Sequence, residues 1–187
     1  MYCSMQPYAQ KLGLDVPLVS YNGALVKGAL SGKVYVNSPL KLQTALDLLQ
    51  YVKENGHYVQ VYMGDKLYVK EENEYSRMYA KISGIQAVAI GEEIYSIKEA
   101  PNKLLLMTAT ENFEATWKDV EEKFKGRVDV TSSKDNYLEL MEPGVNKWQA
   151  VKSLAESFGI KPEEIMCIGD SINDLSMIKN AGIGVAV

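Results

Sequence analysis

The sequence predicts an α/β protein in which the two ends of the chain share one layer and the middle forms an inserted α+β unit. The last quarter alternates apolar, β-branched strands with helices, a pattern typical of a parallel layer. The middle shows hairpins of alternating strands separated by helices, which is typical of an α+β unit. With 187 residues, the chain is long enough for one domain or two small ones.

The first 37 residues are expected to hold one helix and three short strands. Gly13 is of the type that commonly ends a helix, and Asn22-Gly23 is a turn pair that follows the first strand. The expected elements are a helix over 6–12 and strands over 16–21, 24–27 and 33–37, the last two forming a hairpin.

Residues 38–141 are expected to alternate helices with strand pairs. Ser38-Pro39 is predicted to cap the first helix, in which apolar residues recur at helical spacing. The apolar run 87–90 fits either a strand or a helix. The expected helices cover 38–54, 73–82 and 112–124, and the expected strands cover 58–63, 66–70, 103–108, 128–132 and 137–141.

The remaining residues, 142–187, show a different order. An amphipathic helix is followed by a buried strand, a second helix and the start of another buried strand. We therefore place residues 1–37 and 142–187 in one α/β layer, with 38–141 inserted between them. The expected elements are helices over 147–158 and from 170 to about 180, and strands over 165–169 and 183–187.

Composition narrows the possible functions and partners. A net charge of -4 argues against a nucleic-acid partner, and no apolar stretch approaches the ~20 residues of a membrane span. The first ten residues lack the pattern of a signal peptide. Cys3 and Cys167 lie far apart and suggest neither a disulfide framework nor a zinc site, so we expect a cytoplasmic protein.

The strongest chemical signal is the run 169–174, Gly-Asp-Ser-Ile-Asn-Asp, at the end of a buried strand. Ligands bind beyond the carboxyl ends of strands in open α/β sheets. Asp170 and Asp174 stand one helical turn apart, so both can face one magnesium ion, while Asn173 adds a neutral amide for an anionic oxygen. The alternative is a helix cap followed by an ordinary first-turn acid.

Lys147 and Asn22 are further candidate site residues, whereas His57 is not. Lys147 opens a helix, where a cation is unfavourable unless an anion lies nearby, although a solvated surface lysine explains it equally well. Asn22 ends a short strand and can lie at the same sheet edge as Asp170, but a plain hairpin turn is slightly favoured over direct substrate contact. His57 has no evident partner and is expected on the surface.

Together these motifs resemble the Cof-type phosphatases of the haloacid-dehalogenase-like superfamily, over essentially the whole chain. The motifs are Asn22-Gly23-Ala24, the run 144–147, the run 169–174 with Met177, and the run 181–186. The resemblance implies an incomplete Rossmann-like core with a large inserted α/β cap domain. On this division 1–37 and 142–187 are the core and 38–141 is the cap.

The resemblance also implies a magnesium-dependent phosphatase acting on small phosphorylated metabolites. Lys147 would stabilise the phosphoryl charge, and Asn173 with Asn22 would hold the phosphate. Asp170 would bind magnesium, and Asp174 would bind the metal or orient it through water. Such roles suit phosphoryl transfer, in which catalysis is mostly positioning and charge stabilisation.

The chain departs from the family pattern in ways that affect activity. The Asp-x-Asp motif that carries the family's nucleophile is absent, as is the Ser/Thr motif of the second core strand, and Trp148 replaces a usual glycine. We therefore expect a family member truncated at both ends and inactive alone. Two absent strands would leave exposed core strand edges, through which identical chains would associate. A phosphosugar mutase and a non-catalytic binding fragment remain as alternatives.

Overall fold

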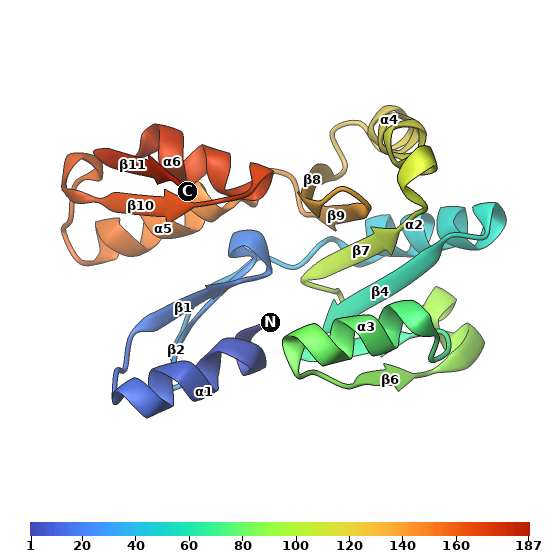
Figure 1. Ribbon diagram of the computed structural model, residues 1–187, viewed down its shortest axis with the longest axis horizontal. Helices are drawn as coiled ribbons and strands as arrows, with labels where there is room; N and C mark the ends of the chain where they lie inside the picture. Colours follow the sequence, from blue (N-terminus) through green and yellow to red (C-terminus); the bar gives the residue numbers. More distant parts are fainter.

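The computed structural model describes residues 1–187 and contains three separate sheets, flanked by six helices (Figure 1). The helices are α1 (Tyr2–Leu12), α2 (Leu42–Asn55), α3 (Glu74–Ser83), α4 (Phe113–Lys123), α5 (Lys147–Ser157) and α6 (Leu175–Asn180). The strands are β1 (Pro17–Ser20), β2 (Leu25–Gly28), β3 (Val34–Asn37), β4 (Tyr58–Met63), β5 (Lys66–Val69), β6 (Ala87–Ala89), β7 (Lys103–Met107), β8 (Asp129–Lys134), β9 (Tyr137–Met141), β10 (Met166–Gly169) and β11 (Ile183–Ala186). No helix is both long and apolar enough to cross a membrane.

The largest sheet has six strands in the order β6-β5-β4-β7-β9-β8, all drawn from the middle of the chain. Helices α2 and α4 cover one of its faces. Alternation along the strands supplies that face, since Val59 and Val61 of β4 point into the same core as Leu104 and Leu106 of β7. This core is the larger of two hydrophobic clusters, with 18 buried residues.

The opposite face of the same sheet packs against the N-terminal segment and α3. Tyr62 of β4 and Leu105 of β7 pack with Tyr2 of α1 and with Tyr21 and Leu25 beyond β1. Helix α3 adds Tyr75 and Tyr79, whose rings meet Tyr58 and Tyr62 at centroid distances of 5.2 and 6.0 Å. This face therefore joins the first 37 residues to the large sheet.

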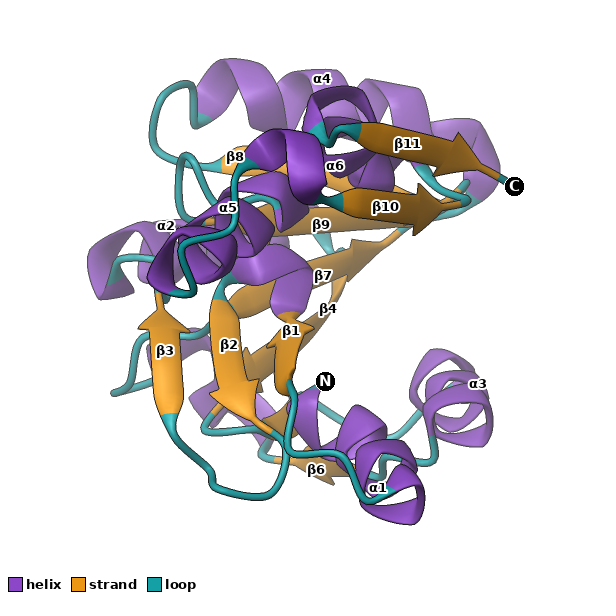
Figure 2. Cartoon of the chain, turned by 90° about the vertical axis from the view of Figure 1, so that its left-hand side faces the viewer, coloured by secondary structure: helices purple, strands orange, loops and turns teal.

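The strands of the two chain ends do not pair with each other, and each end forms a sheet of its own. β1, β2 and β3 form an antiparallel sheet, because β1 turns back through a 3-10 helix, η1 (Tyr21–Gly23), to pair with β2. β10 and β11 form a separate parallel pair. Helix α5 lies between them, contacting β1 and η1 on one side and α6 on the other (Figure 2).

Most element boundaries match the predictions, but two helices start elsewhere and His57 lies in a different environment from the expected one. Ser38-Pro39 does not cap α2, which begins at Leu42 because the N–H of the buried Leu40 is bound to the carbonyl of Pro101. Helix α1 starts earlier than expected, at Tyr2. The ambiguous run at 87–90 becomes β6, parallel to β5. His57 is half-buried and partnered, since its ring lies 5.7 Å from that of Tyr51.

Candidate active site

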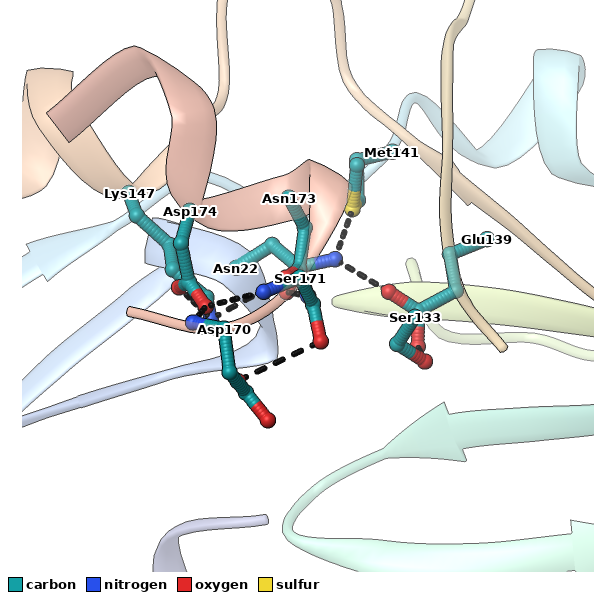
Figure 3. Close-up of polar contacts among 9 residues, drawn as sticks. All are labelled: Asn22, Ser133, Glu139, Met141, Lys147, Asp170, Ser171, Asn173 and Asp174. Carbon is teal, nitrogen blue, oxygen red and sulfur yellow. Dashed lines mark hydrogen bonds and ion pairs between the residues drawn. The ribbon is translucent and has the colours of Figure 1, made fainter. Parts of the chain in front are cut away.

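The candidate site forms where η1, the start of α5 and a second 3-10 helix, η5 (Ile172–Asp174), meet (Figure 3). Tyr21 and Asn22 both have left-handed backbone angles, with φ of 51° and 54°, and these aim the Asn22 side chain at η5. Gly23 allows η1 to approach α5 closely, because a Cβ there would lie 2.5 Å from the carbonyl oxygen of Asn146. The conformation of η1 therefore brings three distant segments together.

Lys147 and Asp174 form the central ion pair. Asn146 caps α5 by accepting the N–H of Gln149 at 3.0 Å, which fixes Lys147 as the first helical residue. The ammonium of Lys147 donates to Oδ1 of Asp174, a side chain that is only 5% exposed. The anion expected near this helix start is thus supplied from within the chain, by Asp174.

Asp174 is held in its ionised form by its surroundings. Burial alone would raise its pKa, but the hydrogen bond and charge of Lys147, together with the N–H groups of Asp170 and Ser171, lower it. Those two N–H groups donate to Oδ2 at 3.2 and 3.3 Å. Both carboxylate oxygens of Asp174 are therefore occupied by protein donors.

Asn173 and Asn22 extend the site on the other side of Lys147. The side-chain oxygen of Asn173 accepts from the Lys147 ammonium at 3.3 Å, while its Nδ2 donates to Oδ1 of Asn22 at 3.1 Å. The structure therefore brings Lys147, Asn173, Asp174 and Asn22 into one connected group. Asn22 lies in the turn between β1 and β2, and the hydrogen bond from Asn173 joins it to this group.

Asp170 differs from the other predicted residues because its carboxylate is exposed. Its one side-chain hydrogen bond comes from the hydroxyl of Ser171, at 3.3 Å, and its side chain points away from Lys147 (Figure 3). An exposed carboxylate fits a magnesium site, since this ion commonly takes one or two carboxylates and completes its shell with water and phosphate. No cluster of three or more histidine, cysteine or acidic side chains suited to a metal ion is present.

Glu139, Lys103 and Ser133 belong to the same network and were missed from the sequence. Glu139 accepts from the Lys103 ammonium at 2.8 Å, the Ser133 hydroxyl at 3.0 Å and the Asn22 amide at 2.5 Å. A lone acid inside the apolar strand 137–141, and a lysine opening the apolar strand 103–107, were the signals that could have identified this buried pair.

A cleft of about 670 Å³ adjoins the group and reaches toward α4. Lys147, Asn173 and Asn22 line one part of it, and Lys118 and Lys125 line another. Its volume lies within the range of small-molecule pockets, which is roughly 300–1,000 Å³.

The chain belongs to the family of haloacid dehalogenase-like hydrolases, which matches residues 1–187. Phosphatase YwpJ of Bacillus subtilis is 26% identical, over 95% of this chain and 71% of its own length. A second B. subtilis relative, 5-amino-6-(5-phospho-D-ribitylamino)uracil phosphatase YitU, is 25% identical, over 100% of this chain and 70% of its own length. The crystal structure of TM0651 from Thermotoga maritima matches all of this chain and 70% of that one, with a TM-score of 0.83 and 30% identity. The chain thus spans about seven tenths of the length of each of these three proteins.

Proposed function

We propose that this chain is the phosphate- and magnesium-binding part of a phosphatase acting on small phosphorylated metabolites in the cytoplasm. The family and the phosphatase names of the relatives support the reaction class. YitU is named for a phosphorylated ribityl compound, and the cleft beside Lys147 has a volume suited to a molecule of that kind. On this proposal residues 38–141 are the cap that selects the substrate and the remainder is the core.

The observation that carries the proposal is the unfilled hydrogen-bonding capacity of Lys147. An ammonium has three N–H donors, and Lys147 directs one to Asp174 and one to Asn173. The third can bind a phosphate oxygen, because the side chain lines the cleft and is 28% exposed. Asn173 also keeps one amide hydrogen beyond the one that it gives to Asn22.

The acidic residues divide into two roles under this proposal. Asp170, whose carboxylate is exposed, would hold the magnesium ion directly, whereas Asp174 orients Lys147 and the loop before η5. When bound, magnesium would neutralise phosphate charge and polarise its oxygens. Lys147 and Asn173 then bind and orient the phosphoryl group.

We further propose that the 187 residues alone do not hydrolyse a phosphate ester. The sequence lacks the Asp-x-Asp motif that carries the family's nucleophile, while Asp174 and Glu139 are each paired with a lysine and Asp170 is assigned to the metal. A phosphosugar mutase would share the same phosphate site, and no contact in the structure favours it over a phosphatase.

The test is a hydrolysis assay with p-nitrophenyl phosphate and magnesium. We expect no turnover by the 187-residue chain, and magnesium-dependent turnover once an upstream segment with an Asp-x-Asp strand and a C-terminal segment complete the core. Asp170→Ala should then abolish the activity, whereas Asp135→Ala, at an exposed turn between β8 and β9, should leave it unchanged. Turnover by the chain alone that survives Asp170→Ala would refute the assignment.

A further inference from the structure

Glu139 is a buried acid in the middle of β9, on the face of the large sheet that packs toward η1. It is 4% exposed, and the strand register places it opposite Leu105, so that Lys103 lies diagonally across on β7. Burial disfavours its charge, but the Lys103 charge and the hydrogen bonds from Lys103, Asn22 and Ser133 outweigh burial and lower its pKa. Glu139 is therefore an ionised acceptor at neutral pH.

An ionised carboxylate only accepts hydrogen bonds, and this fixes the orientation of the next group in the network. Asn22 must turn its NH₂ end toward Glu139, where Nδ2 lies 2.5 Å from Oε2 and 3.1 Å from the sulfur of Met141. Its oxygen consequently faces the other way, toward η5.

The same constraint passes to Asn173. Because Asn22 presents an oxygen, Asn173 donates its amide to it at 3.1 Å and turns its own oxygen toward the Lys147 ammonium at 3.3 Å. If Asn173 alone were reversed, its NH₂ group would face the ammonium and its oxygen would face the oxygen of Asn22. If Asn22 alone were reversed, its NH₂ group would face that of Asn173 and its oxygen would face the Glu139 carboxylate. The hydrogen-bond direction at Lys147 thus follows from the charge on Glu139.

We propose that Glu139 is a positioning residue, whose carboxylate sets the orientation of Asn22 and Asn173 and thereby the position of the Lys147 ammonium. We call the chain of hydrogen bonds from Glu139 through Asn22 and Asn173 to Lys147 the relay. The role of Lys147 in phosphate binding rests on the proposed function, but the relay itself does not depend on turnover. Lys103 keeps Glu139 ionised, and Ser133 supplies one hydrogen bond without belonging to the relay. The relay links strand β9 of the large sheet to the site in η5.

The test compares Glu139→Gln with the unchanged 187-residue chain by ¹⁵N NMR of the side-chain amides. Glutamine has about the size of glutamate, but it can present either an oxygen or an NH₂ group to Asn22, so the direction of the hydrogen bonds in the relay is no longer fixed. We expect the Asn22 and Asn173 amide signals to shift, and the Asn173 amide protons to exchange with water about tenfold faster, as for the loss of one hydrogen bond. The nuclear Overhauser effect between the two side-chain amides should disappear.

Two matched controls separate the relay from general loosening of the fold. Ser133→Ala removes a hydrogen bond to Glu139 but leaves its charge, and should leave the Asn173 signals in place. Glu142→Gln makes the same substitution three residues away, at an acid bound to Lys41, and should also leave the Asn173 signals in place. If Glu139→Gln leaves the Asn173 amide unaltered, or if both controls shift it equally, the proposal is wrong.

Asn22→Gly provides a second test in case Glu139→Gln fails to fold. Glycine accepts the left-handed backbone at this position and interrupts the relay while leaving the Glu139–Lys103 pair intact. We expect Asn173 to lose its partner and its amide signals to move toward those of a solvated side chain. Unchanged Asn173 signals would overturn the relay, whereas a failure of Lys147 to bind inorganic phosphate would refute only the proposed function.

Discussion

Individual residues hold η1 in a backbone conformation that most side chains avoid. Tyr21, Asn22 and Gly23 follow one another with φ of 51°, 54° and 106°, and the first two are the only non-glycine residues besides Asp65 with positive φ. Such conformations cost roughly 1–3 kcal/mol each and persist only where the surroundings enforce them. Here the hydrogen bonds from Tyr21 to Asp65, at 2.6 Å, and from Asn22 to Glu139 do so.

Gly23→Ala is expected to destabilise the protein by about 3 kcal/mol. The added Cβ disfavours the backbone φ of 106° and also collides with the carbonyl oxygen of Asn146. Gly13→Ala is the matched control. Its φ is 66° but no atom lies within 4 Å of the added Cβ, so about 1 kcal/mol should be lost. Urea unfolding of both variants measures the difference, and equal losses would contradict the close packing of η1 on α5.

Stability should fall in acid because the pKa values of Glu139 and Asp174 are lowered from 4.5 and 3.8. A carboxyl with a lowered folded-state pKa stabilises the protein above its unfolded-state value, and this contribution is lost as the pH falls through the folded-state pKa. Urea unfolding between pH 7 and pH 3 should therefore show the free energy of unfolding dropping below about pH 4.5. Glu139→Gln should flatten that drop, whereas Glu121→Gln, at an exposed acid of α4, should not. A pH profile identical to wild type in Glu139→Gln would contradict the account.

At the scale of elements, the six-stranded sheet is the most extensively packed part of the molecule. β4 and β7 lie at its centre, paired on both sides and covered by α2 and α4 on one face and by the N-terminal segment and α3 on the other. The β10–β11 pair packs mainly against the short helix α6, and Met166 and Ile168 are more than half exposed. Two-stranded sheets are marginally stable without such cover.

Amide hydrogen exchange should therefore be slowest in β4 and β7 and much faster in β10 and β11. The measurement is exchange by NMR or mass spectrometry on the whole chain, with the two sets of strands serving as each other's reference. Rapid, uniform exchange across β4 and β7 would show that residues 38–141 do not form a stable unit.

The sequence allowed most of these elements to be predicted, because their signals are local. Tyr58 to Met63 alternates between two faces, and Asn73 caps α3 as its residue type favours. The sequence also marked Lys147, Asn173 and Asp174 as candidates for one site, although a plain turn was slightly favoured for Asn22. The relay could not, since Asn22 and Glu139 are 117 residues apart and meet only through the register of β7 with β9 and the turn of η1.

For the whole molecule, the two small sheets leave strand edges without partners. β1 pairs on one side only, and β10 pairs only with β11, while Ile168 and Ile183 are 56% and 54% exposed. Unpaired edges that carry apolar side chains favour pairing with another chain. Residues 1–37 and 142–187 are therefore where we expect identical chains to meet.

Analytical ultracentrifugation should show association that increases with concentration. Ile168→Lys places a charge on the exposed edge strand, which commonly blocks such pairing, and should shift the protein toward monomer. Lys161→Met, which changes an exposed lysine outside the strands, is the control. A monomer at every concentration would contradict the proposed association.

The central claim is that Lys147, Asn173 and Asp170 form a phosphate and magnesium site, and calorimetric titration with inorganic phosphate tests it most directly. With magnesium present, we predict that Lys147→Met weakens phosphate binding by about tenfold or more, as for the loss of a charged hydrogen bond. Lys152→Met, on the same helix but paired with Glu156 at 3.8 Å, should bind phosphate as wild type does. Asp170→Ala should remove the dependence on magnesium. Phosphate binding that is unchanged in Lys147→Met, or equally weakened in Lys152→Met, would contradict the account.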